Sequence, residues 1–230
     1  MRYWLQKRVK LNQMFNYLKK NKFIWFFISF LLRLNYSFFW KFRGLEEKNY
    51  SETIKGYFED EIFLNFFNNK KGKLKVVELG CGFGLRLFNI KEHKDYSLLG
   101  YDINKKYINL AKKYNEEKKF NIKFYLKKIE DIKLEDDIDY LISSFSLIYI
   151  KKKKLINFFE NNKNKIRKGF ILIEYHTPHK SNNLSYYVHN FKKIFDETLS
   201  NDFEIEFTKI QYKRWIKADH QAYKIIGSLK

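Results

Sequence analysis

The pattern of apolar positions changes repeatedly between two periods from about residue 73 onward. Short runs of alternating or continuous apolar residues predict strands over residues 73–79, 96–102, 122–127, 138–145, 169–175, 202–210 and 221–229. Apolar residues spaced three to four apart predict helices over residues 84–93, 104–117 and 151–166. Alternation at this spacing is typical of parallel α/β sheets that helices cover on both faces.

The last two predicted strands, 202–210 and 221–229, differ from the others because no helix is predicted between them. A parallel crossover needs about a dozen residues or more, so we expect this pair to be antiparallel. The sequence therefore predicts a doubly wound, mostly parallel α/β fold that ends in an antiparallel hairpin.

The first 45 residues are basic and aromatic, and we predict that residues 1–45 form a helical extension of one domain over residues 46–230. The run 23–32 is almost wholly apolar, but it is shorter than the roughly 20 residues that cross a bilayer. On a helix, one stripe would be formed by Lys22, Ser29, Arg33, Ser37 and Lys41. We expect this helix to pack on the domain as a lid, with contact of residues 1–42 with a membrane surface as the alternative.

The chain carries a formal charge of +20, from 46 lysines and arginines against 26 acidic residues. Such an excess suits a polyanionic partner, including nucleic acid or an anionic membrane. We favour compositional drift instead, because lysines are spread along the whole chain and Asn, Ile, Phe and Tyr are also abundant. Hydrophobic residues make up 45% of the chain, which supports a substantial core and argues against disorder.

The single cysteine, Cys81, excludes a disulfide framework and fits a reducing cytoplasm. No group of Cys and His residues has metal-ligand spacing, so we predict no metal. Cys81 stands in a glycine-rich turn that needs small residues and has no obvious histidine partner. We therefore do not expect Cys81 to be a nucleophile.

Three glycines follow the strand predicted at 73–79. We expect Gly80 to permit the sharp turn, Gly82 to leave space where a ligand approaches the backbone, and Gly84 to let the next helix pack closely. A dinucleotide fingerprint would need another glycine at the position of Leu85. The pattern therefore favours a nucleotide ligand other than NAD.

Two carboxylates refine the nature of this ligand. Glu78, two residues before the first glycine, disfavours a pyrophosphate and suits an ammonium or sulfonium group. Asp102 ends the next predicted strand, where a carboxylate can accept both hydroxyl groups of a ribose. The alternative is that Asp102 only N-caps the following helix. The expected ligand has a ribose and a cationic part, and no diphosphate.

The stretch "VVELGCGFG", together with Asp102, resembles the class I S-adenosylmethionine-dependent methyltransferases, and the likeness extends over residues 73–230. This resemblance implies a seven-stranded sheet with an antiparallel last strand, and S-adenosylmethionine as cofactor. It also implies a glycine loop that includes Cys81, with Glu78 near the methionine amino group. The remaining implied cofactor residues are Ile103 beside the adenine, Asp131 (with Glu130 as its rival) at the exocyclic amine, Ile132 along the base, and Ser144 near the methyl donor.

Candidate bases lie where the predicted strands end. His176 directly follows the strand 169–175, and the active site of a parallel α/β sheet lies at this edge. Tyr149 and Glu174 are weaker candidates. The alternative is that His176 is a loop residue without a catalytic task.

The acceptor is predicted from the segment after the fourth strand. Nucleic-acid amino methyltransferases usually carry an Asn/Asp-Pro-Pro-aromatic motif there, whereas this chain has "SSFS". That form is similar to methyltransferases acting on hydroxyl groups of small molecules. We expect O-methylation of a sugar, a sugar phosphate or a cell-surface polysaccharide precursor, with residues 180–200 helping to choose it. An RNA methyltransferase and a non-catalytic binding protein are the alternatives.

Overall fold

The structure is a computed structural model that describes residues 21, 24, 58–179, 186–211 and 221–230. The predicted extension over residues 1–45, its polar stripe and the domain boundary at residue 46 fall outside this part of the chain, apart from Asn21 and Ile24. In the described residues, no helix combines the length and apolar character needed to cross a bilayer.

Within the described residues, seven strands form one sheet in the order β3-β2-β1-β4-β5-β7-β6. The strands are β1 (Lys75–Leu79), β2 (Ser97–Asp102), β3 (Lys123–Leu126), β4 (Ile138–Ser144), β5 (Ile166–His176), β6 (Phe203–Ile210) and β7 (Gln221–Leu229). Strands β1 to β5 are parallel to their neighbours among themselves, and β7 is antiparallel to both β5 and β6. The predicted mostly parallel fold and its terminal hairpin are confirmed.

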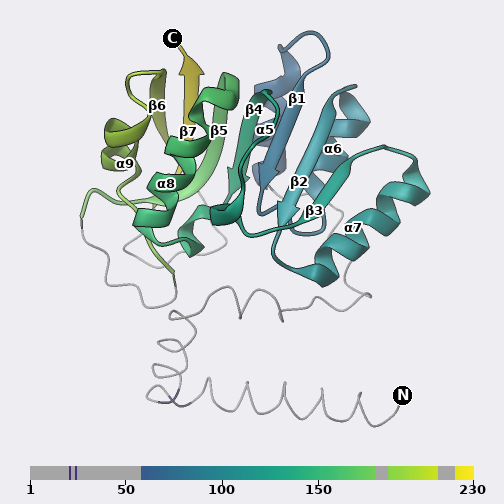
Figure 1. The fold of residues 1–230 in the computed structure, drawn as a ribbon, viewed down its shortest axis with the longest axis horizontal. Helices are drawn as coiled ribbons and strands as arrows, with labels where there is room; N and C mark the ends of the chain where they lie inside the picture. The colour runs from purple at the N-terminus through teal and green to yellow at the C-terminus, as the bar shows by residue number, and fades with distance from the viewer. Residues whose placement is uncertain (1–20, 22–23, 25–57, 180–185, 212–220) are drawn as a thin grey trace.

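Helices cover both faces of the sheet (Figure 1). The helices are α5 (Phe58–Asn68), α6 (Leu85–His93), α7 (Lys105–Lys118), α8 (Lys152–Asn162) and α9 (Phe191–Thr198), with short 3₁₀ turns η2 (Ile129–Asp131), η3 (Leu147–Tyr149) and η4 (Lys163–Lys165). Helices α5, α6 and α7 share one buried apolar cluster, and α8 and α9 share another. Alternate residues of β1 join these two clusters: Val76 lies in the first, and Val77 and Leu79 lie in the second.

The boundary between α8 and β5 corrects the predicted helix over 151–166. Helix α8 ends at Asn162, η4 follows, and β5 begins at Ile166. The buried Asn162 side chain donates to the carbonyl of Ile132 and accepts from the amide of Leu134, so it is engaged in holding the loop before β4. Arg167 extends β5 beyond the predicted strand, where it pairs with an aspartate of the loop that leads into β4.

Helix α5 was not predicted, although its sequence carries a helical signal. Phe63 and Phe67 are four residues apart and both are fully buried. Glu59 and Asp60 lie in its first turn, where carboxylates interact favourably with the helix dipole. Both side chains are nevertheless buried, and Asp60 thereby reaches the site described next.

Candidate functional site

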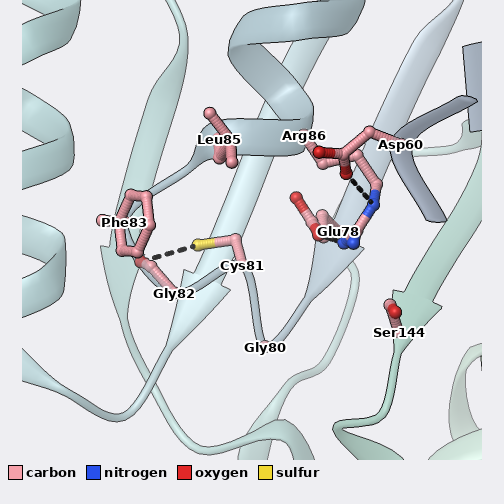
Figure 2. A pocket seen from close by; sticks show the side chains of 9 residues that line it. All are labelled: Asp60, Glu78, Gly80, Cys81, Gly82, Phe83, Leu85, Arg86 and Ser144. Atoms are coloured by element: carbon pink, nitrogen blue, oxygen red, sulfur yellow. Dashed lines mark hydrogen bonds and ion pairs between the residues drawn. The ribbon is translucent and has the colours of Figure 1, made fainter. Parts of the chain in front are cut away.

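A cavity lies at the adjoining carboxyl ends of β1 and β4 (Figure 2). Its volume is about 160 Å³. Pockets that enclose a whole small ligand usually measure about 300–1,000 Å³, so this cavity fits one end of a larger molecule. The residues that line it are Asp60, Glu78, Gly80, Cys81, Gly82, Phe83, Leu85, Arg86 and Ser144. The structure thus brings together five of the residues that the sequence singled out for the cofactor.

The glycine loop has open space at one position and close contacts at the next. Gly82 has a φ of +55°, and a Cβ atom added there would meet nothing within 4 Å. Gly84 has a φ of +86° and N-caps α6, and a Cβ atom there would lie 2.7 Å from the Phe124 ring. At Gly80, the Ser146 hydroxyl occupies the place a side chain would take. The close packing expected at Gly84 is therefore present, and Gly82 has open space beside it, while the approach of a ligand to Gly82 stays a prediction.

Asp102 at the end of β2 is tied to the glycine loop. Its Oδ2 accepts from the amide of Gly82 at 2.9 Å, and its Oδ1 accepts from the amide of Asn104 at 2.7 Å. The N-cap of α7 is Asn104, whose side chain accepts from the amides of Lys106 and Tyr107. The alternative that Asp102 only caps this helix is therefore wrong. Burial raises the pKa of Asp102, and the backbone amides act in the opposite direction.

Three charged side chains form a chain of contacts on one wall of the cavity. Arg86 Nη1 donates to Glu78 Oε1, and Arg86 Nε lies 3.3 Å from Asp60 Oδ1. The guanidinium also lies over the ring of Phe63, 4.5 Å from its centroid. Burial raises the pKa of Glu78 to about 7, although the neighbouring Arg86 favours its ionised form. Sequence analysis predicted Glu78 but missed Arg86 and Asp60.

The cysteine of the loop is a packing residue. Cys81 is buried, and its sulfur occupies the space that a side chain at Gly100 would need. Burial raises the pKa of the Cys81 thiol well above its ordinary value, so the thiol stays neutral. This environment agrees with the expectation that Cys81 is not a nucleophile.

The residues expected around the adenine lie in and beside two turns. Ile103 is half-buried directly after β2, and Asp131 ends η2 with an exposed side chain. Glu130 Oε1 accepts from Lys154 Nζ at 3.0 Å. Ile132 is buried within the core cluster on the α8 side of the sheet. Their roles toward an adenine stay predictions.

A buried carboxylate shapes the turn that follows β4. Glu174 of β5 has one oxygen that accepts from the hydroxyl of Ser143 and from the amides of Ser146 and Leu147, at 3.0–3.1 Å. It thereby caps η3, which has no cap from its own residues. Phe145 in this turn has a φ of +48°, an uncommon conformation for a residue other than glycine. Burial raises the pKa of Glu174 to about 7 despite these donors.

Neither of the two candidate catalytic residues lines this cavity. His176 Nδ1 accepts from the amide of Phe191 at 3.1 Å, and its ring packs against Phe207 and Tyr223. The proton of neutral His176 therefore lies on Nε2. Burial lowers the pKa of His176. Tyr149, in η3, is half-buried against a small apolar cluster at the ends of β5 and β7.

A family model described as "Methyltransferase domain" matches residues 70–220, about two thirds of the chain. No curated protein matches the chain.

Solved structures share the fold at low sequence identity. The PH0226 protein from Pyrococcus horikoshii OT3 is 16% identical, with 81% of this chain and 100% of that chain covered and a TM-score of 0.58. Magnesium protoporphyrin IX methyltransferase from Synechocystis PCC 6803, solved with bound S-adenosylmethionine, is 14% identical, with 89% and 96% covered and a TM-score of 0.59.

An N-methyltransferase from Haemonchus contortus is also similar, and it was solved with phosphomonomethylethanolamine and S-adenosylhomocysteine. It is 14% identical, with 76% of this chain and 53% of that chain covered, and the TM-score is 0.62.

Proposed function

Because this chain belongs to the methyltransferase domain family and is an S-adenosylmethionine-dependent enzyme, we propose that it methylates a hydroxyl group of a small molecule. The acceptors we favour are a sugar, a sugar phosphate or a precursor of a cell-surface polysaccharide. The observation that carries the cofactor site is the contact between Asp102 and the amide of Gly82, beside open space at Gly82.

In the proposed cofactor site, different residues would contact different parts of the cofactor. When bound, S-adenosylmethionine supplies an electrophilic methyl group on a sulfonium. Asp102 would accept the ribose hydroxyl groups, and Glu78 would face the methionine amino group. The bare backbone at Gly82 would allow close approach, and Ser144 would lie near the methyl donor. Ile103, Asp131 and Ile132 would surround the adenine.

The chain would hold the acceptor hydroxyl in line with the methyl group of the bound cofactor, and transfer of that methyl group to the oxygen would leave S-adenosylhomocysteine. The acceptor's hydroxyl proton passes to a base or to water. The chain's main tasks are to align the two reactants and to exclude water. His176 and Tyr149 stay predictions as base. The hydrogen bond from Phe191 weighs against His176, because it occupies the nitrogen lone pair that would accept a proton.

The turn after β4 supports a small acceptor over a nucleic-acid base. Its Ser144-Phe145-Ser146 sequence has no proline. Glu174 of the neighbouring strand accepts hydrogen bonds from two backbone amides of this turn. Two of the similar proteins are linked to small molecules: one is a magnesium protoporphyrin IX methyltransferase, and the other was solved with phosphomonomethylethanolamine. Lysine and arginine side chains would suit a phosphorylated acceptor. An RNA acceptor is favoured only by the net charge of +20. Membrane contact through residues 1–42 also stays a prediction.

Calorimetry with S-adenosylhomocysteine, followed by a methyl-acceptor screen with labelled S-adenosylmethionine, tests the proposal. The screen should contain nucleotide sugars, sugar phosphates, lipids and RNA. We expect cofactor binding and transfer to a soluble hydroxyl compound. Tight RNA binding that weakens steeply with salt, together with RNA methylation, would favour the RNA alternative. Absence of cofactor binding would favour a non-catalytic protein.

A further inference from the structure

We propose that Asp60 and Arg86 are a positioning pair, which holds the Glu78 carboxylate toward the amino-acid end of S-adenosylmethionine. The inference rests on the proposed role of Glu78. It adds a residue from α5, a helix that precedes residues 70–220 matched by the family model.

The contacts link three elements in series: α5, α6 and β1. Asp60 lies 3.3 Å from Arg86 Nε, and Arg86 Nη1 donates to Glu78. The exposed fraction of the side chain is 4% for Asp60, 12% for Arg86 and 1% for Glu78, so these three charges are largely shielded from water. Figure 2 shows Arg86 between the two carboxylates, on the wall of the cavity. A guanidinium with two such partners has little freedom to turn, and its Nη1 fixes one oxygen of Glu78.

The charge balance of this group favours a cationic ligand. Two carboxylates surround one guanidinium, which leaves one negative charge in excess when both carboxylates are ionised. Glu78 Oε2 is buried and has no hydrogen-bond partner among the described residues. Since an unsatisfied buried carboxylate oxygen is costly, a ligand with an ammonium group at this position would relieve the cost. The amino-acid end of the cofactor carries such a group, whereas its adenine and ribose do not.

Asp60 contacts α6 at a second point besides Arg86. Its Oδ2 also accepts from Asn89 Nδ2 at 3.4 Å, one turn beyond Arg86. The carboxylate therefore ties α5 to the first turns of α6. Without Asp60, Arg86 would retain Glu78 but lose the contact that fixes its position. Breaking a buried group of charges by removing one partner leaves the others poorly compensated.

Two ligands separate this role from a general effect on folding. S-adenosylhomocysteine carries the amino-acid end, and 5′-methylthioadenosine lacks it but keeps the adenine, ribose and sulfur. We expect Asp60→Asn to weaken S-adenosylhomocysteine binding about tenfold, because it removes the ion pair that fixes Arg86 beside Glu78. Binding of 5′-methylthioadenosine should change less than about twofold. Both are measured by calorimetry.

Two further variants complete the design. Arg86→Lys keeps the charge but cannot contact both carboxylates in the same way, so it should also lose affinity for S-adenosylhomocysteine and not for 5′-methylthioadenosine. This variant replaces Asp60→Asn in the test if Asp60→Asn does not fold. Asp95→Asn removes an exposed aspartate that pairs with Lys91 and Lys73. This control should bind both ligands like the wild type.

Equal losses for both ligands, or no loss for either, in a folded Asp60→Asn or Arg86→Lys would overturn the positioning role. Glu78→Gln distinguishes this outcome from failure of the proposed site. If Glu78→Gln leaves the preference for S-adenosylhomocysteine unchanged, then the amino-acid end does not lie at Glu78. In that case the proposed cofactor role of Glu78 and the positioning role of Asp60 and Arg86 both fail. If Glu78→Gln abolishes the preference while the Asp60 and Arg86 variants keep it, then only the positioning role fails.

Discussion

Two alanine substitutions in the glycine loop should separate cofactor binding from folding. Both Gly82 and Gly84 have a left-handed backbone conformation, which costs an alanine about 1–2 kcal/mol. Alanine also restricts the unfolded chain, which returns about 0.4–1 kcal/mol. The net loss of unfolding free energy for Gly82→Ala is therefore about 0–1.6 kcal/mol, because its added methyl group meets no atom within 4 Å.

Gly84→Ala carries the same backbone cost and a collision. Its Cβ would lie 2.7 Å from two atoms of the Phe124 ring and 3.2 Å from Phe88. Both rings are buried and pack against each other, so neither can move away freely. Overpacking of this kind costs about 1–3 kcal/mol. Because the backbone terms cancel in the comparison, Gly84→Ala should be less stable than Gly82→Ala by about 1–3 kcal/mol.

Urea denaturation measures the two free energies of unfolding, and calorimetry measures S-adenosylhomocysteine affinity. We expect Gly82→Ala to weaken binding by at least about tenfold, since about 1.4 kcal/mol corresponds to that factor and a methyl group would enter the cofactor's space. Wild-type affinity in Gly82→Ala would refute the assignment of that open space to the cofactor. Equal stability of the two variants would refute the close approach of α6 to β3.

Three other outcomes are expected. Asp102→Ala should weaken S-adenosylhomocysteine binding by about 1–3 kcal/mol in calorimetry, through lost charge-assisted hydrogen bonds, and unchanged affinity would remove Asp102 from the site. Burial raises the pKa values of Glu78 and Glu174 from 4.5 to about 7, so the folded protein holds protons that the unfolded chain releases. Burial lowers the pKa of His176 and lowers that of His189 to about 4, and these shifts act in the opposite direction. The comparison is therefore made with Glu174→Gln: as the pH rises from about 5 to about 7, the free energy of unfolding of the ligand-free wild type, from urea curves, should fall relative to that of Glu174→Gln, and a relative rise would contradict the shift at Glu174. His176→Ala should leave cofactor affinity nearly intact, and its rate in a methyl-transfer assay tests the base: a wild-type rate would exclude His176, in line with the hydrogen bond from Phe191, whereas a large loss would favour it.

Local patterns were sufficient to predict the sheet. Each strand alternates or runs apolar over a short segment, and the short link before β7 settled the direction of the hairpin. The glycine loop was equally accessible, because backbone freedom at Gly82 and close packing at Gly84 both require the same residue type. Family resemblance then supplied the roles that spacing alone left open.

The remaining features depend on contacts between residues distant in the sequence. Arg86 is one of many basic residues in the chain, and only its burial between α5 and β1 distinguishes it. Glu174 carried a weak signal, as the one charged residue in an apolar run. Its role as a cap for η3 arises only when β4 and β5 lie side by side. The four-residue spacing of Phe63 and Phe67 indicates a helix at α5. This signal is weaker than that of the more aromatic segment that precedes it, and it was not used.

The position of β7 between β5 and β6 has a consequence for synthesis of the protein on the ribosome. The middle of β5 is wholly apolar and fully buried in the finished sheet, with Ile171, Leu172 and Ile173 all at 0% exposure. A nascent chain holds this strand with one side unpaired until residues 221–229 have emerged. Unpaired apolar strands associate readily with other chains, so β5 is most prone to aggregation in the interval before residues 221–229 emerge.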